Sequence, residues 1–160
     1  MLQVLFYAAF AAVVGYLSFW PRYHYASADL ATVKLSLSHA TERVVPCVQL
    51  TPQEIAELPP NMRTQQSCER QRLPLILELD VDGDTVLHVD AVPSGLWSDG
   101  PASVYERFDL APGTHTITLR MRDSSQQDSW DYTHSESVVL EAGRYTTITF
   151  KAENGGFRIR

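Results

Sequence analysis

The first twenty residues constrain the fold of this chain more than any other segment. No charged side chain occurs between Leu2 and Trp20. Nineteen helical residues rise about 28 Å, close to the roughly 30 Å hydrocarbon thickness of a bilayer. The sequence that follows is polar enough for water. We therefore expect a transmembrane anchor over residues 1–22, a linker over 23–30 and one extramembrane domain over 31–160.

A cleaved secretory signal is the alternative to an anchor. Such a signal has a basic leading segment, an apolar run of about 7–15 residues and a small-residue cleavage site. Residues 26–28 (Ala-Ser-Ala) would supply that site, but no Lys or Arg precedes the apolar run, which is also longer. The sequence therefore favours the anchor. Since the basic flank is missing and Arg22 follows the apolar run, the positive-inside rule alone is silent or leans against placing the C-terminal domain outside the cytoplasm.

The cysteine content bears on the compartment. Cys47 and Cys68 are the only two cysteines, and they form neither a CxxC nor a CxxCH motif. An even number in a small extramembrane domain favours a disulfide and an oxidising compartment. This predicts that the C-terminal domain lies in an oxidising compartment such as the periplasm. Two unrelated buried thiols are the alternative.

One face of the apolar segment carries small residues. Two pairs share the spacing that lets a second membrane helix approach closely, and their members are Ala8, Ala11, Ala12 and Gly15. The pattern predicts packing against integral membrane protein subunits, within the lipid bilayer. The alternative is that alanine is simply common in such helices.

Alternating apolar and polar residues predict a mainly β domain. Asp82-Gly83 lies between two alternating runs, which is a strong hairpin pattern. Seven short strands separated by turns indicate an immunoglobulin-like antiparallel β-sandwich. The expected strands are Val33–Ser38, Leu75–Val81, Thr85–Ala91, Val104–Leu110, Thr114–Met121, Glu136–Leu140 and Tyr145–Lys151.

An irregular segment, residues 41–72, interrupts the expected strands. Thr51-Pro52-Gln53-Glu54 has the capping residue, early proline and first-turn acid of a helix start, and Pro59 ends that helix. The two cysteines lie within this segment and bracket the expected helix. We expect their disulfide to hold the short helix against the sandwich.

Composition and motifs argue against several functions. A net charge of −6 argues against binding nucleic acid or an anionic membrane surface. Asp80, Asp82 and Asp84 resemble the start of a calcium loop, but Ala91 stands where the closing Glu is needed. The hairpin turn instead predicts that all three acids face solvent. No histidines have metal-ligand spacing, and no nucleophile elbow, phosphate loop or HExxH motif occurs. We expect no metal, no cofactor and no enzymatic activity.

Two loops carry large apolar residues. Leu96 and Trp97 lie in the Gly/Pro-rich run Pro93–Pro101, and Trp130 and Tyr132 belong to a second loop. Exposed aromatic residues on loops are typical of contact sites. The alternative is that each tryptophan folds back over one end of the sandwich.

Three segments carry a family resemblance: LTPQEIAELPPNMR at 50–63, PSGLWSDGP at 93–101 with VYER at 104–107, and LRMRD at 119–123. They resemble a poorly characterised group of short proteobacterial proteins with one N-terminal membrane helix and a periplasmic domain. The resemblance covers most of the chain. It implies a single-pass protein of the bacterial inner membrane with its C-terminal domain in the periplasm, and an association with respiratory haem–copper oxidases of the cbb class. It supplies no catalytic residues. We expect an accessory or assembly subunit of a membrane complex; the alternative is a free-standing binding module for a peptide, small ligand or cell-wall component.

Overall fold

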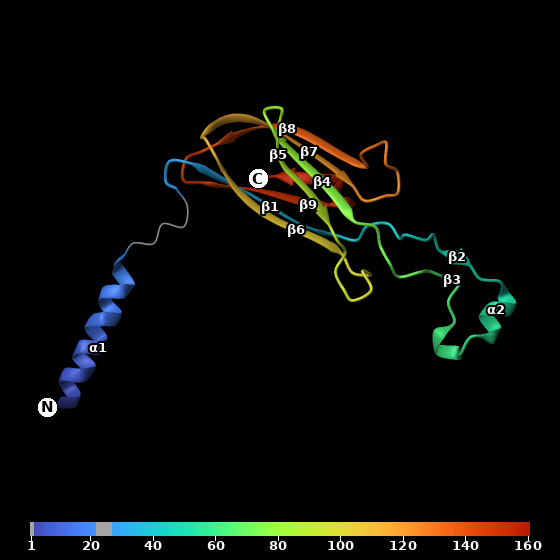
Figure 1. The fold of residues 1–160 in the computed structure, drawn as a ribbon, viewed down its shortest axis with the longest axis horizontal. Coiled ribbons are helices and arrows are strands. Elements are labelled where there is room, and N and C mark those ends of the chain that lie inside the picture. The colour runs from blue at the N-terminus through green and yellow to red at the C-terminus, as the bar shows by residue number, and fades with distance from the viewer. Residues whose placement is uncertain (1, 22–26) are drawn as a thin grey trace.

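The computed structural model describes residues 2–21 and 27–160, so residues 23–26 of the expected linker lie outside the described part. Helix α1 spans Leu2–Phe19, and none of its residues is buried. By length and composition it is able to cross a membrane. Figure 1 shows it apart from the β-rich domain.

The domain contains two four-stranded sheets. The first has the strand order β10-β9-β1-β6 and the second the order β5-β4-β7-β8. The strands of the first sheet are β1 (Ala31–His39), β6 (Ala102–Leu110), β9 (Tyr145–Lys151) and β10 (Gly156–Ile159). Those of the second are β4 (Leu75–Val81), β5 (Asp84–Ala91), β7 (Gly113–Arg122) and β8 (Tyr132–Leu140). The turn η2 (Ala152–Asn154) joins β9 to β10.

The two sheets enclose one apolar core. Leu35 and Ile148 of the first sheet and Leu77 and Leu119 of the second are each 0% exposed and belong to a single cluster. Burying one such side chain contributes about 1.5–3 kcal/mol. The alternating strand pattern therefore indicated the inward face correctly. The expected mainly β class, with an N-terminal apolar helix and a sandwich-like pair of sheets, is confirmed.

Two features of the sheets differ from the expectation. Strand β1 pairs with β9 in parallel, with Ser36 opposite Thr149, so the first sheet is not wholly antiparallel. Strand β10 was not expected at all. Its four residues are too few to show alternation, and the αL residue Gly155 (φ 84°) turns the chain back so that Phe157 pairs with Phe150.

The expected hairpin between β4 and β5 is present. Asp82 and Gly83 have φ values of 54° and 95°, which suit a tight turn. The Asp82 carboxylate accepts the Thr116 N–H at 2.8 Å and contacts His115 Nδ1 at 2.6 Å. The turn is thereby fixed to β7. His115 is partly buried, in phase with the buried residues Ile117 and Leu119 of β7.

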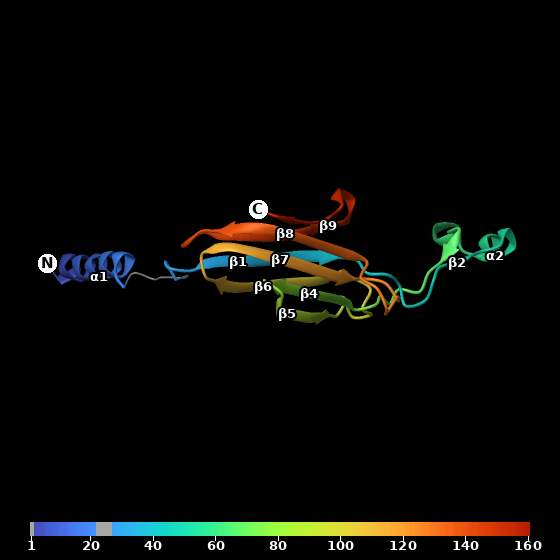
Figure 2. The same ribbon diagram turned by 90° about the horizontal axis from the view of Figure 1, so that it is seen from above.

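The segment 41–72, which we call the arm, projects from the sandwich (Figures 1 and 2). Its two sides pair antiparallel through the bridge Arg43–Arg72 and the strands β2 (Val48–Gln49) and β3 (Gln66–Ser67). At its tip lie α2 (Pro52–Glu57) and the turn η1 (Pro60–Met62).

The capping motif of α2 is the one expected. Thr51 Oγ1 accepts the Glu54 N–H, and Glu54 accepts the Thr51 N–H at 2.7 Å. The expected disulfide Cys47–Cys68 is confirmed, with an S–S distance of 2.08 Å. The expected packing of α2 against the sandwich is wrong. No residue of α2 is buried, and the disulfide joins the two sides of the arm to each other rather than the arm to the sandwich.

Candidate interaction site

The loops with the expected contact residues gather at one end of the sandwich. Strand β1 begins on the anchor side at Ala31 and ends at His39, and we call the end near His39 the far end. Register places the other strand termini there: His39 lies opposite Ala102, and Met121 lies opposite Tyr132. The arm, loop 92–101 and loop 123–131 therefore all leave the sandwich at its far end.

Loop 92–101 is closed at its neck by its own backbone. Ser94 N–H donates to Pro101 O at 3.1 Å, and Gly100 N–H donates to Ser94 O at 2.8 Å. A Cβ on Gly100 would lie 2.3 Å from Ser94 Oγ, so the close approach requires glycine. Arg72 of the arm donates its N–H to Ser98 O at 2.9 Å and its Nε–H to Asp99 O at 3.1 Å. The loop is therefore held at both its neck and its side.

The tip of this loop presents two large apolar side chains to solvent. Leu96 is 90% exposed and Trp97 is 68% exposed. Trp97 lines a small pocket of about 200 Å³ with Glu69, Arg70 and Gln71 of the arm. A well-held loop with an exposed Leu-Trp pair is typical of a contact surface. For these two residues, the alternative of folding back is wrong.

Trp130 and Tyr132 pack against their own domain. The Trp130 ring lies over the guanidinium groups of Arg120 and Arg122, with ring-to-Cζ distances of 5.8 Å and 5.7 Å. The Tyr132 ring meets the Phe150 ring edge to face at 4.9 Å. Both side chains are partly buried. Trp130 and Tyr132 therefore fold back onto the sandwich, as the alternative interpretation stated. Of the four expected contact residues, only Leu96 and Trp97 remain candidates for contact with a partner.

A carboxylate cluster orders the second far-end loop. His39 Nε2 lies 2.5 Å from Asp123 Oδ2, and both side chains are less than a fifth exposed. Burial raises the pKa of the Asp123 carboxyl, with His39 opposing the shift. Burial also acts to raise the pKa of Asp131, but the N–H groups of Asp123 and Ser124 and the Ser124 hydroxyl bring it below its usual value. These contacts explain the loop's shape without a ligand.

The apolar surface extends beyond the expected pair. Within residues 27–160, seven of the eleven exposed large apolar side chains lie on the arm or at the far end. We call these side chains, which are distributed over the arm and loop 92–101, the far-end patch: Val44, Val45, Val48, Met62, Val92, Leu96 and Trp97. Sequence reasoning missed the first five. For Val44, Val45 and Val48, the sequence did offer one indication of exposure. These valines lie close to Cys47 but belong to no alternating strand pattern that would bury them.

The small-residue face of α1 is uncovered. Ala8, Ala11 and Ala12 are exposed, and a Cβ on Gly15 would meet no atom within 4 Å. A second helix would therefore find this face free of contacts from residues 2–21 and 27–160. Its role in packing stays a prediction.

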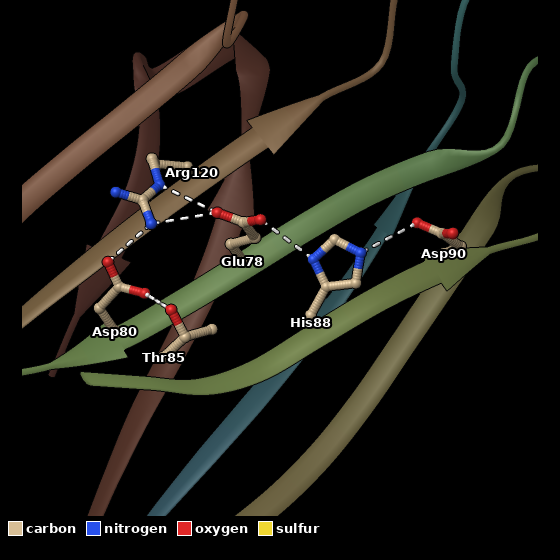
Figure 3. A network of polar contacts seen from close by, with 6 residues as sticks. All are labelled: Glu78, Asp80, Thr85, His88, Asp90 and Arg120. Carbon is tan, nitrogen blue, oxygen red and sulfur yellow. Dashed lines mark hydrogen bonds and ion pairs between the residues drawn. The ribbon is translucent and has the colours of Figure 1, made fainter. Parts of the chain in front are cut away.

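A network of polar contacts lies on the outer face of the second sheet (Figure 3). Arg120 Nη2 contacts Glu78 at 3.0 Å and Asp80 at 2.7 Å, and Asp80 also accepts the Thr85 hydroxyl at 2.8 Å. His88 contacts Glu78 at 3.1 Å. Every group in this network has a partner, which is typical of a structural network rather than a reactive site.

The acids of the supposed calcium loop do not converge. Asp80 is only 7% exposed and pairs with Arg120, whereas the Asp82 carboxylate contacts His115. The expectation that the acids at 80, 82 and 84 all face solvent is therefore wrong for Asp80. Among the described residues, no group of three or more His, Cys, Asp or Glu side chains is arranged to hold a metal ion.

No protein-family model, curated protein or solved structure matches this chain. The candidate site therefore rests on its own geometry.

Proposed function

We propose that this protein is a non-catalytic accessory or assembly subunit of an integral membrane complex, with α1 packed on the partner's helices and the far-end patch contacting its extramembrane part. The observation that carries the proposal is the Leu96–Trp97 pair, held exposed on a loop fixed by Arg72. Monomeric proteins rarely expose such side chains together unless a partner covers them.

The positions of the two surfaces suit one extended partner. Strand β1 has nine residues, so the far end lies about 26–30 Å from the start of the sandwich. The arm carries the patch further still (Figure 1). A partner that touches both surfaces needs helices in the bilayer and a domain outside it. Membrane complexes with extramembrane domains, respiratory oxidases among them, have this form.

Two features support a non-catalytic role. The titratable side chains at the far end serve the fold: His39 pairs with Asp123, and Asp131 caps the turn at Ser124. The network of Arg120 is likewise satisfied internally. The periplasmic orientation rests on the Cys47–Cys68 disulfide, which persists in oxidising compartments.

Co-purification of full-length variants tests the proposal. Ala12→Leu with Gly15→Leu fills the small-residue face, and Leu96→Ser with Trp97→Ser removes the apolar pair. Each double variant is expected to lose an integral membrane partner that the unaltered chain retains in mild detergent. A matched control, Val139→Ser, removes a side chain that is 67% exposed but lies on β8 outside the patch. Retention of the partner by both double variants would contradict the proposal.

A free-standing binding module is the second candidate. The pocket beside Trp97 favours it, because a small ligand or a peptide side chain is able to enter about 200 Å³. In that case α1 is only a tether. The Ala12→Leu, Gly15→Leu variant would then keep full binding, whereas the Trp97→Ser variant would lose it.

A further inference from the structure

The outer face of the first sheet is rich in hydroxyl groups. Side chains that point away from the core on β6, β1 and β9 form a shallow groove of about 440 Å³. Its outward polar and aromatic lining is Ser36, Ser38, Ser103, Tyr105, Thr149 and Lys151. Tyr105 is 67% exposed.

The same face carries an excess of positive charge. Lys34 lies on β1, Lys151 on β9 and Arg158 on β10, all in outward register. Arg107 and Asp109, 3.9 Å apart, largely offset each other. Lys34 and Lys151 are the only lysines among the chain's 160 residues.

The outer face of the second sheet has no such excess. There Glu78, Asp80 and Asp90 accompany Arg120 and Arg122. The net charge of −6 is therefore unevenly distributed. The negative net charge argues against binding of the whole chain to an anionic membrane surface. It does not argue against such binding by the outer face of the first sheet.

We propose that the outer face of the β10-β9-β1-β6 sheet lies on the anionic headgroups of the membrane in which α1 is anchored. This inference rests on the proposed anchoring. The three cations stand on three neighbouring strands, which lie about 4.8 Å apart, and do not converge on one point. Such spacing suits a diffuse anionic surface better than a single small anion.

Because α1 anchors the domain to a membrane, that membrane is the favoured binding partner for this face. A domain joined to α1 by a short linker experiences the bilayer surface at high effective concentration. Each lysine or arginine near an anionic surface strengthens binding about fivefold, so three cations give roughly a hundredfold. Tyrosines such as Tyr105 and Tyr145 also favour the membrane–water interface.

Amine labelling of the full-length protein in nanodiscs tests the inference. The protein is placed in discs of phosphatidylcholine alone or of phosphatidylcholine with phosphatidylglycerol, and modification of Lys34 and Lys151 is followed by mass spectrometry. Severalfold protection of both lysines is expected only with phosphatidylglycerol. The protection is expected to vanish in 1 M salt, where the Debye length is about 3 Å.

Control variants separate docking from other causes. Ser137→Lys places a reporter amine on the outer face of the second sheet, where labelling is expected to be equal in the two lipids. Arg158→Glu is expected to weaken the protection of Lys151, whereas Arg70→Glu, the same charge change on the arm, is expected to leave it unaltered.

Several outcomes would overturn the inference. Equal labelling in both lipids would do so, as would protection that persists in high salt. Protection by a soluble anionic polysaccharide in phosphatidylcholine discs, with none from phosphatidylglycerol, would assign the face to a glycan instead. Failure of the anchor is distinguishable, because the protein would then not co-purify with the discs at all.

Discussion

Removing the disulfide is expected to unfold the arm and to leave the sandwich intact. The perturbation is Cys47→Ser with Cys68→Ser, which leaves no free thiol. The two cysteines are 21 residues apart, and a loop of that length corresponds to about 3 kcal/mol of chain entropy. If the disulfide stabilises only the arm, its loss changes local opening of the arm. If it stabilises the whole domain, its loss lowers the global unfolding temperature.

The structure assigns this stabilisation to the arm. Beyond its base, the arm is held by its own ladder, for example Val44 N–H to Gln71 O and Leu50 N–H to Gln65 O, both 3.0 Å. No residue of α2 is buried. The two sides join the sandwich only near their base, where Leu73 N–H donates to Glu42 O at 2.9 Å. The arm is therefore expected to open locally while the core persists.

Two measurements on the same sample test this expectation. Hydrogen exchange at the Leu50 and Val44 amides is expected to accelerate by about a hundredfold, which is the equivalent of 3 kcal/mol. Calorimetry of the sandwich is expected to show a change of no more than a degree or two. Leu77→Ala serves as the contrast, because truncating a fully buried core residue costs about 2–5 kcal/mol and lowers the global transition.

A large drop in the global transition would refute the reasoning. If the whole 3 kcal/mol belonged to global stability, a domain of this size would lose roughly 10–15 °C in Tm. Such a drop in the double serine variant, with arm and core exchanging together, would mean that the arm and the sandwich unfold as one unit.

Further predictions concern ionised side chains. Hydrogen bonds to the Asp82 carboxylate and to Ala111 O raise the pKa of His115, so its stabilising contribution is present below about pH 6.5 and is lost as the pH rises through the raised pKa. Urea unfolding across this range is expected to show that decline, and Asp82→Asn, which leaves the hydrogen bond to Ala111 O in place, is expected to reduce it; an unchanged slope would contradict the assignment. Arg120→Met leaves the buried Asp80 without its cation and is expected to cost about 1–3 kcal/mol in chemical denaturation. Arg122→Met, which also removes a guanidinium under the Trp130 ring, is the control, and an equal loss from both variants would show that stacking dominates.

Local features of this fold were predictable from the sequence because short-range chemistry determines them. The Asp82-Gly83 turn, the Thr51 cap and the strand alternation around Leu77 all involve residues close together in the chain. The disulfide was also predictable, because Cys47 had only Cys68 as a partner.

Long-range features were not predictable from local pattern. The parallel pairing of β1 with β9 joins Ser36 to Thr149, and no local rule specifies that partner. The same holds for the candidate site. Both tryptophans lie in loops, yet Trp130 is covered because β7 places Arg120 beneath it, whereas Trp97 stays exposed. The charge separation between the two faces likewise depends on which strands share a sheet.

The particle mass of the full-length protein, extracted in mild detergent from cells at its natural abundance, tests the central claim most directly. Light scattering combined with mass spectrometry would give both the mass and the composition. The proposed accessory role predicts a particle containing this 18.0 kDa chain in fixed ratio with a polytopic membrane protein. A detergent-bound particle containing this chain alone would contradict it.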